Sequence, residues 1–152
     1  MPLIIRWPGV INAGITNDRM VQNIDFAPTF LEIAGISIPG DIQGRSILPL
    51  LRNNGKVSNW REQVYYHYYA YPDWHMVRPH FGLRTERYKL IHHYSIDEWE
   101  LFDLEKDPDE MISLYTNPEY SDIARMMSSR LEKERIAVGD TVMLQATSTY
   151  RR

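Results

Sequence analysis

The chain of 152 residues has the size of a single domain with a modest core, and its 43% hydrophobic and 24% charged residues are ordinary for a globular protein. Its formal net charge of -3 argues against a nucleic-acid partner, because neutralising phosphates requires a basic face. The sequence contains no cysteine, which excludes disulfides and thiolate sites, and no apolar run reaches the roughly 20 residues that a membrane span needs.

Residues 3–7 form a short apolar run that predicts a buried strand. The turn pair Pro8-Gly9 ends it. A buried strand needs neighbours on both sides, and neither a leader nor a cap precedes this run. We therefore expect an N-terminal portion of the protein to be missing, together with any signal that would fix the compartment.

Residues 25–35 predict a helix with an apolar face that includes Phe26 and Phe30. Asp25 suits the N-cap, and Pro28 is tolerated in the first turn. Gly35 suits the C′ position, where a left-handed backbone conformation ends many helices. The pattern indicates one helix with a defined start and end.

A second, short helical segment is predicted after Ser46, which can cap a turn that runs to Leu51. The polar residues 52–59 follow, with the turn pair Asn54-Gly55, and are the best candidate for a boundary between structural units. The resulting division is a first domain at residues 1–58, a second at residues 59–138, and a tail at residues 139–152.

Four strand candidates follow one another at residues 64–71, 81–85, 87–93 and 100–104. Because they lie close together in sequence, an antiparallel meander is the expected topology. Asn117-Pro118 then starts a helix that runs to about Val138 and is closed by Gly139. Its predicted apolar face comprises Ile123, Met126, Met127 and Leu131. Such a helix would cover one face of the small sheet, in an α+β arrangement.

The five histidines of the chain all lie in residues 65–94, together with seven of its tyrosines. No two of them have the i, i+4 spacing that places two metal ligands on one helix face, and His92 and His93 point to opposite faces of a strand. The spacing therefore favours packing or hydrogen bonding within the sheet for His67, His92 and His93 over a metal site.

The loop at residues 72–80, PDWHMVRPH, joins two predicted strands and carries Trp74, His75, Arg78 and His80. Binding residues are often found on loops that a rigid sheet holds in place. Trp rings stack on sugars, while His and Arg donate to hydroxyls or anionic oxygens. The four residues are therefore candidates for binding a ligand; the alternative is a structural loop with a buried Trp.

The acidic residues Asp103, Glu105, Asp107 and Asp109 alternate as they do in an EF-hand loop. Pro108 replaces the required glycine, however, and Leu114 replaces the terminal bidentate glutamate. A solvated turn after a strand is the better interpretation. The sequence also lacks a Gly-x-Ser-x-Gly elbow and a glycine-rich phosphate loop, so the residues alone predict no catalytic set.

Several segments, in the right order, resemble the C-terminal part of type I sulfatases, which depend on formylglycine and belong to the alkaline-phosphatase-like superfamily. These segments are PLIIRWPG, VQNIDFAPTFLEIAGISIPGDIQGRSILPLL, RTERYKLI and ELFDLEKDPDEMISL, within a match from about Pro2 to Leu131. The resemblance implies the last strand and helix of an alkaline-phosphatase-like α/β domain, followed by an α+β C-terminal subdomain. In that subdomain a small antiparallel sheet packs with a C-terminal helix.

The resemblance also implies hydrolysis of sulfate esters by the full-length protein, with a formylglycine residue and a calcium ion. The C/S-x-P-S-R motif that would supply the formylglycine is absent from this chain, so no catalytic residue or metal ligand can be assigned to it. The candidates for binding substrate are therefore Trp74, His75, Arg78 and His80. Their segment is similar to the corresponding segment of bacterial members that act on sulfated glycans. By the same resemblance the protein would be periplasmic or secreted.

The main hypothesis is therefore a C-terminal sulfatase fragment that is inactive alone and contributes scaffold and substrate contacts. Its partners would be a sulfated carbohydrate and the missing N-terminal catalytic portion. A stand-alone carbohydrate-binding module is one alternative, and it requires the chain to bind glycans by itself. A purely structural domain is the other, and it requires Trp74 and His75 to be buried.

Overall fold

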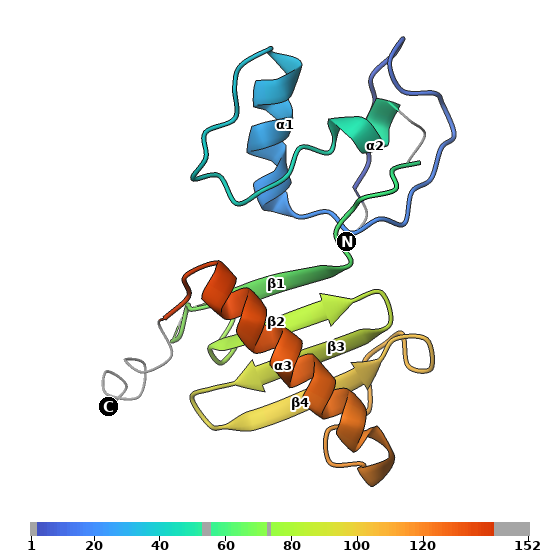
Figure 1. The fold of residues 1–152 in the computed structure, drawn as a ribbon. Coiled ribbons are helices and arrows are strands. Elements are labelled where there is room, and N and C mark those ends of the chain that lie inside the picture. Colours follow the sequence, from blue (N-terminus) through green and yellow to red (C-terminus); the bar gives the residue numbers. More distant parts are fainter. Residues whose placement is uncertain (1–2, 53–55, 73, 142–152) are drawn as a thin grey trace. The chain divides into compact units, whose positions relative to one another are not determined.

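Four strands of the second half of the chain pair in sequence order as an antiparallel sheet, which confirms the predicted meander (Figure 1). They are β1 (Gln63–Tyr68), β2 (His80–Thr85), β3 (Tyr88–His93) and β4 (Glu98–Asp103). The computed structural model describes residues 3–52, 56–72 and 74–141. It divides into two compact units, Met1–Arg61 and Glu62–Arg152, and the sheet belongs to the second.

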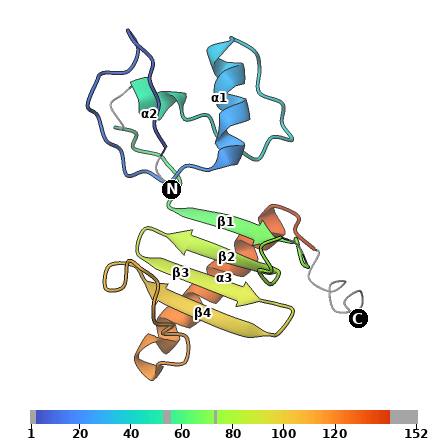
Figure 2. The ribbon, with the colours of Figure 1, turned by 180° about the vertical axis from the view of Figure 1, so that it is seen from behind.

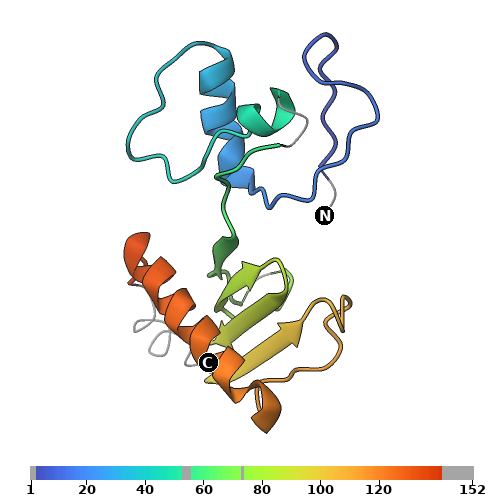
Figure 3. The same cartoon turned by 45° about the vertical axis from the view of Figure 1, so that its right-hand side comes forward.

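Helix α3 (Ser121–Ala137) lies across one face of this sheet (Figures 1 and 3). A short 3-10 turn, η2 (Pro118–Tyr120), precedes it, and the Asn117 side chain accepts a hydrogen bond from Glu119 N, as the predicted cap requires. Gly139 follows the helix with φ +69°, the left-handed conformation typical of a C′ glycine. The predicted helix and both of its ends are confirmed.

The core between α3 and the sheet follows from the alternation of each strand. Strand residues two apart share a face, and those facing α3 are apolar: Phe81 and Leu83 on β2, Leu90 on β3 and Leu101 on β4. Met127 and Leu131 of α3 pack against them. Each of these side chains is almost completely removed from water, which makes this cluster the main hydrophobic contribution to the stability of the unit.

The predicted apolar face of α3 is wrong in one residue. Met127 is fully buried, whereas Met126 is 44% exposed. The buried positions are Ala124, Met127, Leu131 and Arg135, which recur at the helical spacing of three and four residues. Arg135 places its guanidinium 4.5 Å from the centre of the Phe81 ring. A long cation therefore covers the end of the core, a position that hydrophobicity alone does not reveal.

Asp103, at the end of β4, is fully buried and ion-paired with Arg87. Arg87 Nε lies 3.1 Å from one carboxylate oxygen of Asp103, and Arg87 Nη2 lies 2.9 Å from the other. These bonds hold the pKa of Asp103 below its ordinary value. The interpretation of the acidic run as a solvated turn is therefore wrong for Asp103, because the pair ties the β2–β3 turn to the end of β4.

The first unit contains η1 (Asn23–Asp25), α1 (Phe26–Ile33) and α2 (Leu48–Arg52). The helix predicted at residues 25–35 is confirmed, with Gly35 at φ +70° after its end. The short second helix is confirmed too, and Ser46 Oγ accepts a hydrogen bond from Leu48 N at 3.2 Å. The turn predicted at Asn54-Gly55 and the end of the tail lie outside the described residues.

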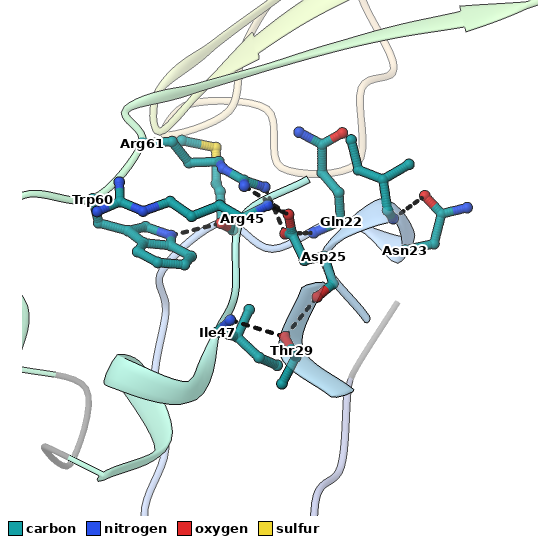
Figure 4. Close-up of polar contacts among 10 residues, drawn as sticks. Gln22, Asn23, Asp25, Thr29, Arg45, Ile47, Trp60 and Arg61 are labelled. Atoms are coloured by element: carbon teal, nitrogen blue, oxygen red, sulfur yellow. Dashed lines mark hydrogen bonds and ion pairs between the residues drawn. The ribbon is translucent and has the colours of Figure 1, made fainter. Parts of the chain in front are cut away.

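Asp25 stands at the N-cap of α1 as predicted, but its carboxylate does not cap the helix (Figure 4). It is fully buried and accepts two hydrogen bonds from the Arg61 guanidinium, at 2.6 and 2.7 Å. It accepts two more from the backbone N–H groups of Gln22 and Arg45, at 2.7 and 2.8 Å. Four donors around one carboxylate join three separate stretches of this unit.

Gly44 allows the loop before α2 to close against η1. A Cβ at this position would lie 1.9 Å from the carbonyl oxygen of Ile24, far inside van der Waals contact. This contact puts Arg45 N beside Asp25. The absence of a side chain at Gly44 is therefore a condition for the Asp25 cluster.

The strand predicted at residues 3–7 is wrong for this unit. These residues are irregular, and Ile4 is 89% exposed. The described part of the first unit contains no strand with which they could pair, and a buried strand requires both hydrogen-bonded neighbours and cover. Other apolar side chains of the unit also face solvent, among them Phe30, which is 68% exposed.

In the part of the chain that the structure describes, every helix is too short or too polar to span a bilayer.

Candidate functional site

Figure 2 shows the sheet face opposite α3 turned toward the viewer. Aromatic and histidine side chains group on this face. Tyr68 of β1 pairs in register with His80 of β2, and Tyr66 pairs with Gly82. Paired residues project to the same face, so Tyr66, Tyr68 and His80 lie together. The His93 ring on β3 adjoins them, with its centroid 5.1 Å from that of His80. We call these four residues the open-face cluster.

His80 is the only predicted site residue that lies on a strand, at the first position of β2. Its ring stacks on Tyr68 at a centroid distance of 5.5 Å and meets the edge of Tyr66 at 5.9 Å. Its Nδ1 lies 2.8 Å from the carbonyl oxygen of Arg78. The ring is therefore held on three sides at the base of the loop that carries the other candidates.

The other three candidates lie on the loop between β1 and β2. Trp74 is 96% exposed, and His75 is exposed as well. The guanidinium of Arg78 lies 5.8 Å from the centre of the Tyr71 ring. The structure thus joins His80 to the backbone of Arg78, places the Arg78 guanidinium near Tyr71, and exposes Trp74 and His75, so the alternative of a buried Trp is wrong.

Gly82 is what allows the open-face cluster to form. A Cβ on Gly82 would lie 2.5 Å from the Tyr66 hydroxyl oxygen and 2.8 Å from the Leu90 carbonyl oxygen. The Tyr66 ring therefore occupies space above Gly82 that any side chain would fill. This burial raises the pKa of Tyr66 above its ordinary value, with smaller contributions from Glu110 and Glu100. Tyr66 is consequently a neutral hydroxyl at the site.

Tyr66, Tyr68 and Glu100 were not predicted to be part of this face. Glu100 lies 3.0 Å from His93 Nε2, and Lys89 forms an ion pair with Glu110 on the same face. Part of this face could be predicted from the sequence, because residues two apart on a strand share a face, which groups Tyr66 with Tyr68. Adding residues of the other strands requires the strand register, which sequence spacing alone did not provide.

The remaining sheet histidines have structural roles, as predicted. His67 Nδ1 lies 2.5 Å from Asp140 and its Nε2 lies 3.1 Å from the Tyr94 hydroxyl, and both side chains of the His67–Asp140 pair are buried. His92 stacks on Trp99 at 3.9 Å and contacts Asp97 through Nε2 at 2.9 Å. His92 and His93 do project to opposite faces of β3.

We expect the second unit to lose stability as the pH falls below the ordinary histidine pKa of 6.5, because burial lowers the pKa of His92 in the folded state. Asp97 opposes this shift, while Arg135 and His93 add to it. The unfolded chain then binds the proton more readily, so its free energy decreases relative to the folded state. An NMR titration of the His92 ring should give a pKa below 6.5, and a value at or above 6.5 would contradict this account.

A substitution of His92 distinguishes its contribution to the pH dependence of stability from that of the other titratable groups. His92→Gln should make the free energy of unfolding less dependent on pH between neutral and mildly acidic conditions. Some dependence should remain, because burial also lowers the pKa of His80. Urea unfolding at several pH values measures both effects.

Within residues 3–52, 56–72 and 74–141, no three His, Asp or Glu side chains come together in a way that could hold a metal ion. The described residues therefore offer no cluster of carboxylate or histidine ligands for the calcium implied by the sequence resemblance, and the precursor motif of formylglycine is absent from the sequence. The open-face cluster and the loop offer rings for stacking, one guanidinium and several polar acceptors. This chemistry is suited to holding a polar ligand and lacks an evident nucleophile.

Comparisons with known proteins agree with the sequence resemblance. Residues 1–137 match the family model described as N-sulphoglucosamine sulphohydrolase, C-terminal. An N-acetylglucosamine-6-O-sulfatase of Bacteroides thetaiotaomicron is 49% identical over 135 residues, which are 88% of this chain and 24% of the relative. The chain thus spans about a quarter of the length of that curated relative.

Solved structures show the same likeness. A protein in complex with its substrate D-glucosamine-2-N,6-O-disulfate matches with a TM-score of 0.86 and 45% identity, covering 91% of this chain and 28% of that one. A putative sulfatase from Bacteroides thetaiotaomicron matches with a TM-score of 0.68 and 29% identity, covering 76% of this chain and 25% of that one. The four-stranded sheet and its helix are therefore a sulfatase C-terminal subdomain, and the chain belongs to the family of N-sulphoglucosamine sulphohydrolase C-terminal domains.

Proposed function

We propose that this chain is the C-terminal part of a sulfatase that hydrolyses sulfate esters of carbohydrates, and that it supplies scaffold and substrate contacts to a catalytic centre located elsewhere in the protein. The observation that carries the proposal is the 49% identity, over 88% of the chain, to an N-acetylglucosamine-6-O-sulfatase. A similar structure that was solved with D-glucosamine-2-N,6-O-disulfate supports a sulfated sugar as the substrate class.

The first unit, in this proposal, is the end of an alkaline-phosphatase-like α/β domain whose remainder is a further partner of the chain. Exposed apolar side chains support it: Ile4 on the segment that failed to form a strand, and Phe30 and Ile33 on α1. Large apolar side chains on a small unit favour contact with other protein. Residues 3–7 would then be a strand that forms only when neighbouring strands are present.

The loop residues Trp74, His75 and Arg78, together with His80, are the proposed substrate contacts. An indole that is 96% exposed can stack on a sugar face, and Arg78 carries donors suited to anionic oxygens. The calcium ion and the formylglycine belong, in this proposal, to the catalytic portion. The proposed contacts of these four residues with the substrate do not depend on the calcium ion or on the formylglycine.

Substitutions in a longer enzyme that carries this chain test the proposed contacts. His75→Ala and His80→Ala should each raise KM or lower kcat/KM on a sulfated sugar by about three- to tenfold, the effect of one lost hydrogen bond. Arg125→Ala, an exposed position on α3, is the matched control and should leave both constants unchanged. Unchanged kinetics in both histidine variants would remove these two residues from the proposed site.

The stand-alone carbohydrate-binding module makes a different prediction for the isolated chain. A module should bind D-glucosamine-2-N,6-O-disulfate measurably in isothermal titration calorimetry, whereas one wall of a larger site should bind it weakly or not at all. The coding sequence upstream of Met1 supplies an independent test. An open reading frame with C/S-x-P-S-R there supports the sulfatase, and its absence supports the module.

A further inference from the structure

The tautomer of His80 follows from its contact with Arg78. The Arg78 carbonyl oxygen can only accept a hydrogen bond, so His80 Nδ1, at 2.8 Å from it, carries a proton and donates. In a neutral imidazole the second nitrogen, Nε2, then has a free lone pair. No hydrogen bond to this nitrogen comes from the described part of the chain.

The surroundings of His80 favour the neutral ring. Tyr68 stacks on it, and Tyr66 approaches it edge-on. Burial lowers the pKa of His80, the Arg78 carbonyl opposes this, and the nearby His93, His67 and Lys89 lower it further. A second proton on His80 would therefore add a cation beside other basic groups in a partly desolvated position.

We propose that His80 accepts a hydrogen bond at Nε2 from a neutral donor of the substrate, a sugar hydroxyl or amide N–H, and that it does not bind the sulfate or a carboxylate. This inference rests on the proposed function, because it takes the loop to be part of a sugar site. A lone pair at Nε2 repels an anionic oxygen, since both are acceptors. Binding of the anionic group falls instead to Arg78, whose guanidinium has donors only.

From the sequence, His80 was expected to bind either hydroxyls or anionic oxygens, whereas a neutral ring protonated at Nδ1 can bind only a hydrogen-bond donor at Nε2. Arg78 and His80, two residues apart, then have different roles. The backbone carbonyl of Arg78 fixes the orientation of the His80 ring, and its guanidinium binds the anionic group of the substrate. His80 accepts a hydrogen bond from a hydroxyl or amide of the sugar, which makes it a specificity-determining residue.

The tautomer can be tested directly on the 152-residue chain, without any ligand. Long-range proton–nitrogen NMR correlations distinguish a ring protonated at Nδ1 from one protonated at Nε2 or at both. At neutral pH, His80 should show the proton at Nδ1 alone. A ring protonated at Nε2, or an imidazolium, would overturn the inference and leave the proposed function intact.

Three substitutions in the longer enzyme test recognition, with D-glucosamine-2-N,6-O-disulfate as the probe. His80→Gln can place an amide oxygen near the position of Nε2 and should keep kcat/KM within about threefold. His80→Asn can keep the bond to the Arg78 carbonyl but loses the distal acceptor, and should lower kcat/KM by about tenfold. His80→Lys introduces a cation and should lower kcat/KM at least as much as His80→Asn.

Different kinetic results would contradict the proposed role of His80 and the proposed function on which that role rests. Activity retained in His80→Lys and lost in His80→Gln would mean that His80 meets an anion, which overturns the inference. An effect of Arg78→Ala with no effect of any His80 variant would also overturn it, while the loop remained a substrate site. If substitutions at Trp74, His75, Arg78 and His80 all left the kinetics unchanged, the proposed contact surface itself would be wrong.

Discussion

Asp25→Asn should lower the free energy of unfolding of the first unit by roughly 3–5 kcal/mol, the cost of removing one partner from a buried ion pair. The Asp25 carboxylate binds the Arg61 guanidinium (Figure 4). The carboxylate is fully buried, and the guanidinium is largely buried too. Asparagine has nearly the same shape but no charge, so the Arg61 cation would be left without its partner. Each carboxylate oxygen also accepts one backbone N–H, from Gln22 or from Arg45, and both donors would lose their anionic acceptor.

Hydrogen exchange gives the measurement for this variant, because the amides of Gln22 and Arg45 both donate to Asp25. Their protection should be lost in Asp25→Asn well before that of amides in the β-sheet. Asp41→Asn is the matched control, since it makes the same change of charge at an exposed position in the same unit. Equal protection in the two variants would show that the buried pair contributes little.

The sequence predicted the local elements of this protein well, because each carries its own signals. Asn117 and Gly139 mark the ends of α3, and Gly35 marks the end of α1. The four strands are short, close in sequence and separated by turn residues, so their order as a meander followed directly. These features depend on residues near one another in the chain.

What the sequence did not predict depends on pairing over longer distances. Asp25 reads as a helix cap because capping is local, whereas its partner Arg61 is 36 residues away. Asp103 reads as a solvated acid because Arg87 reaches it only through the register of β3 and β4. Residues 3–7 read as a strand from their composition, but a strand also needs neighbours, which these residues lack in the described part of the unit.

The same distinction holds for the candidate site. The loop between β1 and β2 was predicted to bind a ligand from residue types alone, and the structure adds that Trp74 on this loop is exposed. The open-face cluster beneath it was not identified, because Tyr66, Tyr68 and His93 join His80 only through cross-strand pairing. The strand register therefore determines which aromatic residues share a face and form this cluster.

Met127→Ala should lower the free energy of unfolding of the second unit by roughly 2–5 kcal/mol, while Met126→Ala changes it by less than about 0.5 kcal/mol. The two residues are adjacent on α3 and chemically identical, but Met127 is fully buried against the sheet and Met126 is 44% exposed. Removing the Met127 side chain leaves a cavity between α3 and the strands that carry Leu83, Leu90 and Leu101. Because both substitutions raise helix propensity equally, the difference between them isolates packing. Urea unfolding followed by circular dichroism measures both variants, and equal losses would mean that α3 does not cover the sheet with the face described above.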